Sequence, residues 1–99
     1  MKCAYFFLSS KNDSKKDRVS LRDGSMWMIG VRDMDDAIET ARELLADGFA
    51  EIELCGGFHA EGAKKLIDAT DNQIVFNYAV HLPEQDDLYY SLFPPKKQS

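Results

Sequence analysis

The chain has 99 residues and a formal net charge of −5. That length has room for one domain, and the charge argues against a nucleic-acid partner, because phosphate binding requires a basic face. One basic cluster is interrupted by acidic residues, a pattern that is typical of a solvated loop. The cluster consists of Lys11, Lys15, Lys16 and Arg18, interrupted by Asp13 and Asp17.

The first residues do not have the pattern of a secretion signal or of a membrane-spanning segment. Residues 3–8 form an apolar run that is too short for the core of a secretion signal and far too short to cross a bilayer. The two cysteines, Cys3 and Cys55, have no spacing that demands a disulfide. We therefore expect a cytoplasmic protein with reduced thiols and no membrane partner.

The first quarter of the chain predicts two strands joined by a long polar connection. Residues 3–9 are rich in aromatic side chains, which is typical of a buried strand. Residues 10–24 are polar, with room for a short extended piece around residues 19–21. Residues 25–31 read as a second strand, in which Gly30 indicates a bulge or a close approach of backbone.

The hydrophobic period then changes from that of a strand to that of a helix. One apolar stripe with helical spacing is formed by Met34, Ala37, Ile38, Ala41, Leu44 and Leu45. Asp33 is a good N-cap, and Gly48 can take the left-handed conformation that ends a helix. This segment gives the strongest prediction of a helix in the chain.

The second half repeats the alternation of strand and helix. Residues 50–55 alternate as a strand should, and residues 58–70 have an inner helical face. Residues 74–81 are nearly continuous in apolar character and predict a last strand. Residues 88–93 are apolar enough to dock as a short helix or cover, whereas residues 94–99 are expected to be a frayed tail.

These elements predict an α/β fold in one domain over residues 1–93. We expect about four mainly parallel strands in the order β-β-α-β-α-β, with both helices on one face if the three later strands are sequential neighbours. The opposite face would then be bare and would carry Glu51 and Glu53 beside aromatic side chains. We expect residues 88–93 or a second subunit to cover that face, and a homodimer is the prediction we favour.

The chain is organised around a strand, a pair of glycines and the start of a helix at residues 51–62. Gly56 and Gly57 let the backbone approach a ligand closely, and the free N–H groups at the helix start attract an anion. The alternative is that the glycines merely allow a sharp turn. No Walker lysine and no complete dinucleotide fingerprint is present. The candidate ligand-binding residues are Cys55, Gly56, Gly57, Phe58, His59, Glu61 and His81.

Two residues near this turn are candidates for catalysis. Cys55 faces the helix N-terminus and has His59 and His81 as potential bases, although a core cysteine is the common alternative. Glu53 is a candidate general base if burial raises its pKa, and otherwise it is a strand residue on a solvated face. The histidines, Cys55 and Glu61 match no structural zinc spacing, so we expect no metal, and the sequence names no cofactor.

Several segments together resemble a family of small prokaryotic proteins of unknown function. The residues that carry the resemblance are Met28-Ile29-Gly30-Val31, Ala37, Ala41, Leu44, Gly48, the run from Ile52 to Phe58, and Ala79-Val80. The specific part is the strand–Cys-Gly-Gly-Phe–helix signature. Members of that family carry an arginine after the Ala-Val pair, where this chain has His81. The resemblance implies an α/β fold and supplies no established activity.

Three functions therefore compete at this point. The first is a small cytoplasmic domain that holds a small anionic ligand at the turn of residues 55–57. The second is a small enzyme that uses Cys55 or Glu53 at the same turn. The third is an oligomeric protein-interaction module without a small-molecule site, which would use the bare face of the sheet.

Overall fold

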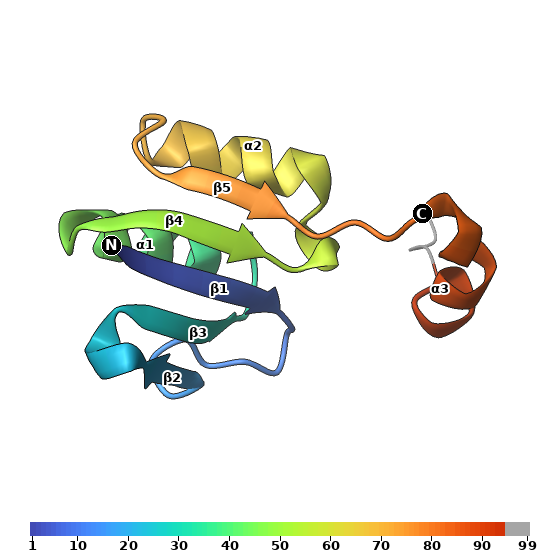
Figure 1. The fold of residues 1–99 in the computed structure, drawn as a ribbon, viewed down its shortest axis with the longest axis horizontal. Helices are drawn as coiled ribbons and strands as arrows, with labels where there is room; N and C mark the ends of the chain where they lie inside the picture. The colour runs from blue at the N-terminus through green and yellow to red at the C-terminus, as the bar shows by residue number, and fades with distance from the viewer. Residues whose placement is uncertain (95–99) are drawn as a thin grey trace.

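The computed structural model describes residues 1–94 as a mixed sheet of five strands with three helices (Figure 1). The strands are β1 (Lys2–Leu8), β2 (Arg18–Leu21), β3 (Met26–Val31), β4 (Phe49–Leu54) and β5 (Val75–Tyr78). The helices are α1 (Met34–Ala46), α2 (His59–Ala69) and α3 (Asp86–Leu92). Short 3-10 turns are η1 (Arg22–Gly24), η2 (Gly56–Phe58) and η3 (Pro83–Gln85). The α/β prediction is confirmed.

The strand order is β2-β3-β1-β4-β5, in which β2 alone is antiparallel to its neighbour. The prediction made both helices share a face on the condition that the strands now labelled β3, β4 and β5 are neighbours in sequence order. That condition is wrong, because β1 lies between β3 and β4. A strand that is apolar along most of its length is suited to such a central position. The chain still moves across the sheet in one direction through α1 and then α2, so right-handed crossovers place both helices on one face (Figure 1).

The core lies between the sheet and the two long helices. Its fully buried side chains include Phe6, Ile29, Ile52, Leu54 and Leu66. On α1, small alanines at Ala37 and Ala41 are buried, which lets the helix lie close to the sheet. Strand alternation leaves every second residue on the opposite face of the sheet.

The ends of α1 are set by local chemistry, as the sequence predicts. The Asp33 side chain accepts a hydrogen bond from the Asp36 N–H at 2.8 Å, which caps the helix start. After the helix, Gly48 adopts a φ of 86°. A side chain would resist that conformation, so glycine terminates the helix cleanly and starts β4.

The long connection after β1 is pinned to the sheet by Asn12. Its side-chain amide donates to the carbonyls of Phe7 at 3.0 Å and Val31 at 3.2 Å. Gly30 makes this possible, because a Cβ there would lie 2.8 Å from Asn12 Cγ and from Phe7 Cζ. The groups that approach Gly30 closely are the side chains of Asn12 and Phe7, and not backbone as the sequence suggested. The extended piece near residues 19–21 forms the edge strand β2.

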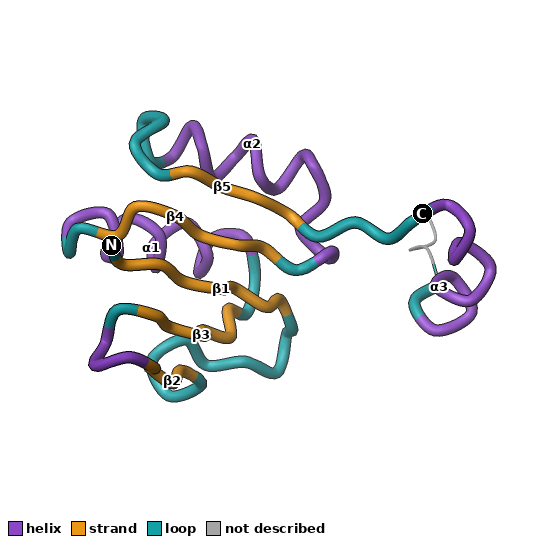
Figure 2. The backbone as a smooth tube through the Cα atoms, viewed as in Figure 1, coloured by secondary structure: helices purple, strands orange, loops and turns teal. Residues whose placement is uncertain are grey.

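The C-terminal end departs from the prediction. The last strand ends at Tyr78, so its predicted extension to His81 is wrong. Residues 79–82 run as an extended connection beyond the sheet, and α3 stands apart from the sheet instead of covering it (Figures 1 and 2). The predicted tail lies outside the described residues from 95 onward. Among residues 1–94, no helix is long and apolar enough to cross a membrane.

Candidate functional site

The turn at residues 55–57 lies at the carboxyl edge of the parallel strands. After β1 the chain turns toward β2 and β3, whereas after β4 it turns toward β5. The gap between β1 and β4 is therefore a topological switch point, which is where open α/β sheets usually bind ligands. The sequence-predicted site and the position favoured by the topology coincide.

Hydrogen bonds fix the turn to the end of β1. The Leu8 N–H donates to Cys55 Sγ at 3.2 Å, and the Cys55 N–H donates to the Phe6 carbonyl at 3.0 Å. The Phe58 N–H then donates to the Cys55 carbonyl at 3.2 Å, which closes the 3-10 turn η2. Cys55 is half-buried and is held in place by both strands, and neither it nor Cys3 forms a disulfide.

The two glycines of this turn are not required by its backbone geometry. Positive φ angles among glycines occur at Gly24 and Gly48, and not at Gly56 or Gly57. A Cβ on Gly57 would lie 3.8 Å from Cys55 Sγ and from Leu8 Cδ2, which is ordinary contact. Unusual backbone angles therefore do not account for the two glycines.

The start of α2 is exposed but has a mixed electrostatic character. No side chain caps it, and the backbone at His59 has a φ of 58° and a ψ of 177°, a conformation that favours glycine. Free N–H groups at a helix start attract anions, whereas Glu61 in the first turn competes with them through its own carboxylate. Phe58 is buried in the core at 3% exposure, so its side chain faces away from any ligand.

His81 contacts the C-terminal segment. Its Nε2 lies 2.6 Å from Asp86 Oδ1, and its ring stacks on Tyr89 at 4.0 Å between centroids. Tyr89 in turn reaches the glycine turn, since its hydroxyl lies 3.5 Å from the position of a Cβ on Gly56. Sequence reasoning missed Tyr89 and Leu8 as neighbours of the turn, because neither lies near it in the sequence.

Glu53 lies on the face of the sheet opposite α1 and α2. The Asn77 side-chain amide donates to Glu51 Oε2 at 2.8 Å and to Glu53 Oε1 at 3.1 Å. A hydrogen bond shared with Glu51 raises the pKa of Glu53, and burial and the negative charge of Glu51 raise it further, while the Asn77 hydrogen bond lowers it. The Glu53 side chain is nevertheless exposed, which is not the enclosed setting of a general base.

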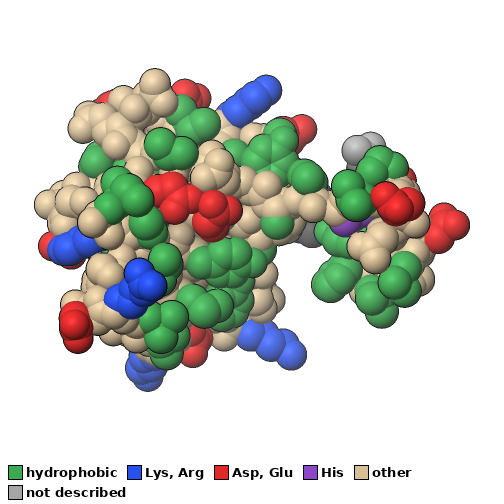
Figure 3. Space-filling model, in the orientation of Figure 1, with side chains coloured by type: hydrophobic (Ala, Val, Ile, Leu, Met, Phe, Trp, Pro, Cys, Tyr) green, Lys and Arg blue, Asp and Glu red, His purple; other side chains and the backbone are tan. Residues whose placement is uncertain are grey.

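This face, which we call the open face, also carries a group of exposed or half-buried apolar side chains, and we call that group the apolar half of the open face. The parallel pairing of β1 with β3 places Tyr5 beside Met28, and the antiparallel pairing of β2 with β3 places Val19 beside Met28. The three side chains therefore lie on the same face of the sheet. The group comprises Tyr5, Phe7, Val19, Leu21, Met26 and Met28, from β1, β2 and β3. Exposure reaches 42% at Met28 and 59% at Val19. Figure 3 shows these apolar patches beside the acidic residues.

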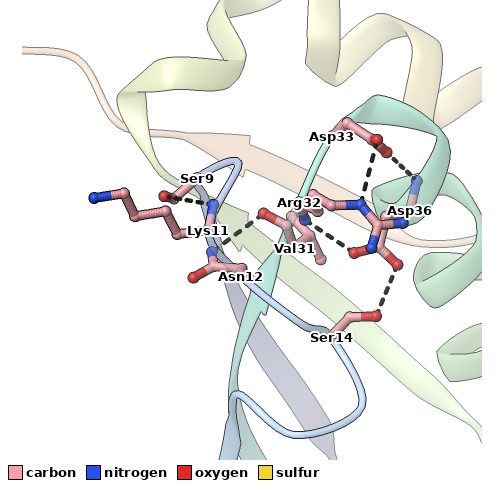
Figure 4. A network of polar contacts seen from close by, with 8 residues as sticks. All are labelled: Ser9, Lys11, Asn12, Ser14, Val31, Arg32, Asp33 and Asp36. Atoms are coloured by element: carbon pink, nitrogen blue, oxygen red, sulfur yellow. Dashed lines mark hydrogen bonds and ion pairs between the residues drawn. The ribbon is translucent and has the colours of Figure 1, made fainter.

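A polar network occupies the carboxyl edge near β3 and secures the start of α1 (Figure 4). Asp36 accepts a hydrogen bond from the Ser14 hydroxyl at 2.7 Å and another from the Arg32 N–H at 2.9 Å. Arg32 also forms an ion pair with Asp33 at 3.6 Å. Because these carboxylates are occupied in holding the loop and the helix, the network reads as structural.

Two surface hollows lie away from the turn. One lies along the outer side of α1, near Ile38 and Arg42, and the other lies between the end of α2 and the start of β5, near Ile67 and Phe76. Neither is lined by residues 55–57. Within residues 1–94, no three potential metal-ligand side chains of His, Cys, Asp or Glu come together.

Comparison with known sequences places the chain in a family. A sequence model described as "Family of unknown function (DUF6506)" matches residues 1–94. The chain belongs to DUF6506. Searches of curated proteins and of solved structures gave no significant match. The resemblance to a family of unknown function is confirmed, and membership of DUF6506 assigns no activity to the turn or to the open face.

Cys55 is expected to react faster with iodoacetamide than Cys3 at neutral pH. Burial raises the pKa of the Cys3 thiol, and the charge of Glu51 and a hydrogen bond to it raise that pKa further, so little Cys3 is present as thiolate. Timed alkylation followed by mass spectrometry measures the two rates, with the urea-unfolded chain as the control. Equal or slower labelling of Cys55 in the folded protein would remove the basis for thiol chemistry at the turn.

Proposed function

We propose that this chain is a self-associating interaction module that forms a homodimer through the open face of its sheet. The observation that carries the proposal is the apolar half of that face, where six side chains from three adjacent strands lie together without cover from α1, α2 or α3. Contiguous exposed apolar surface on a small domain is typical of an interaction site. A second copy with the same face supplies a self-complementary partner.

The acidic residues of the face constrain how two copies meet. Glu51 and Glu53 lie on β4, which is separated from β3 by β1. A two-fold axis over Met28 would bring apolar surfaces together and leave both carboxylates at the rim. That arrangement avoids the cost of burying unpaired charge.

Sedimentation equilibrium of the whole chain at micromolar concentration tests this proposal. We expect a species with twice the mass of one chain, and its fraction should rise with concentration. A monomer over the whole micromolar range would contradict the proposal, because the exposed face would then need no partner.

A second candidate function is binding of a small anion at the turn of residues 55–57. It is favoured by Gly56 and Gly57, whose backbone does not require glycine, next to a helix start without a side-chain cap. Cys55 and His59 flank the proposed site in sequence, His81 is linked to it through its stacking on Tyr89, and Glu61 opposes it. Enzymatic use of Cys55 at this turn is an alternative that the alkylation rates test, whereas the exposure of Glu53 argues against its use as a general base.

Titration with inorganic phosphate, followed by amide NMR, tests the second function. We expect saturable shifts confined to the amides of residues 56–61, because those N–H groups would hold the anion. Sodium chloride at matched ionic strength is the control. Small, unsaturable shifts spread over the acidic surface would contradict a built site.

We infer a cytoplasmic location from the two free thiols, since oxidising compartments favour disulfides. A prokaryotic source is inferred from the family resemblance.

A further inference from the structure

The C-terminal segment forms a projecting arm, which we define as residues 82–93. Its apolar side chains are largely exposed, with Leu82 at 63%, Leu88 at 58% and Leu92 at 65%. The radius of gyration is 14.0 Å, whereas a compact domain of this length has about 12.6 Å. Figure 1 shows the cause, because α3 stands beyond the carboxyl edge of the sheet.

One side of the arm makes aromatic contacts within the C-terminal segment, whereas the other side packs on nothing within residues 1–94. On the first, Tyr89 contacts His81 and also Phe93, at 5.2 Å between ring centroids. On the second, Leu88 and Leu92 are one helical turn apart and share a side. A helix of seven residues is marginal in water unless its apolar face is packed. The side of α3 that carries Leu88 and Leu92 is therefore expected to pack against another surface.

The chain's own sheet is poorly placed to provide that surface. The arm leaves from β5, at the opposite edge of the sheet from β2 and β3. Three strand spacings, about 14 Å, separate β5 from β3. The connection of residues 79–82 runs away from the sheet (Figure 2). Folding back would also carry the acidic arm across Glu51 and Glu53.

The apolar half alone covers less area than a standard interface between two proteins. Three strands over about five residues cover roughly 14 Å by 17 Å, or about 240 Å² per copy. A specific interface buries about 800 Å² per partner. Exchange of arms adds two further contacts by symmetry. Charge also favours docking of the arm on the apolar half. The carboxylates of Glu51 and Glu53 repel the acidic residues Asp86 and Asp87 at the start of α3. Arg22 in η1 borders the apolar half on the other side and attracts them.

We propose that the two copies exchange arms. Leu88 and Leu92 of each chain dock on the apolar half of the open face of the other chain, near Phe7 and Met28. This inference rests on the proposed self-association and names its partner as a second copy of this chain. The projecting arm thus covers the part of the apolar half that the face-to-face contact of the two copies leaves exposed.

Disulfide trapping between separate chains tests the exchange. Leu92→Cys on one chain and Met28→Cys on a differently tagged chain are combined on a background of Cys3→Ser and Cys55→Ser. We expect a mixed-tag disulfide, and no such product when Ser20→Cys replaces Met28→Cys, because Ser20 faces the helix side of the sheet. An intramolecular disulfide that forms at every dilution in a chain carrying both Leu92→Cys and Met28→Cys would overturn the proposal. The absence of any disulfide between differently tagged chains would overturn it as well.

A second measurement keeps the native cysteines and uses the full-length chain. Leu88→Ser with Leu92→Ser should weaken the dimer at least about tenfold, because each arm loses two apolar contacts. Ser91→Ala in the same helix is the matched control and should not weaken it. If the parent chain is a monomer, the proposed function fails. If the parent is a dimer that the leucine substitutions leave unchanged, arm exchange alone fails.

Discussion

Gly30→Val is expected to lower the free energy of unfolding by about 2–4 kcal/mol, from overpacking together with lost hydrogen bonds. Gly30 is buried, and a Cβ there would lie 2.8 Å from both Asn12 Cγ and Phe7 Cζ. Displacing Asn12 would break its hydrogen bonds to the carbonyls of Phe7 and Val31. The loop after β1 would thereby lose its attachment to the carboxyl edge of the sheet.

Urea denaturation measures this loss, and Gly57→Ala is the matched control. Gly57 has ordinary backbone geometry, and a Cβ there would make only ordinary contacts, so alanine should cause no loss of stability. If Gly30→Val unfolds at the same urea concentration as the parent, the hydrogen bonds of Asn12 do not depend on the lack of a side chain at Gly30. If Gly57→Ala is the more damaging change, the glycine turn has a structural role that its geometry does not explain.

The local elements were predictable because their causes are local. The α1 stripe, the Asp33 cap and the φ of Gly48 follow from residues within a few positions of each other. The insertion of β1 between β3 and β4 was not predictable, since alternation fixes which face a side chain occupies and says nothing about which strand lies alongside. The same limit applies to the edge position of β2.

The C-terminal segment shows how composition alone can mislead. Residues 88–93 are apolar, which suggests a cover for the sheet, yet Tyr89 and Phe93 pack on one another and on His81. Local aromatic contacts therefore satisfy part of the segment without the sheet. The strand prediction through His81 failed for a related reason, because the pairing of β5 with β4 ends at Tyr78 and is followed only by a hydrogen bond from the Ala79 N–H to the Leu54 carbonyl.

The strand–glycine–helix pattern predicts where the turn lies in the sheet but not its detailed geometry. The glycine pair lies at the topological switch point, as a strand–glycine–helix pattern predicts. The unusual backbone angle, however, falls on His59 and not on either glycine. Neither this angle nor the contact of Tyr89 with the turn leaves a signal in residue spacing, because both depend on how distant segments pack.

Met28→Glu is expected to weaken the dimer about 100-fold, which corresponds to about 2.8 kcal/mol. Met28 is 42% exposed at the centre of the apolar half, so the isolated chain tolerates a charge there. A two-fold dimer would bury two new carboxylates, one from each copy. Each unpaired carboxylate costs at least about 1.4 kcal/mol on burial, which gives the total.

Sedimentation equilibrium of the variant and the parent measures this effect, and thermal melting of the diluted variant checks that it folds. Ser20→Glu is the matched control, because it adds the same charge on the neighbouring strand but on the helix side of the sheet. That control should dimerise like the parent. A Met28→Glu dimer of unchanged affinity would place the interface elsewhere, since no two-fold contact over β3 could accept two facing carboxylates without loss.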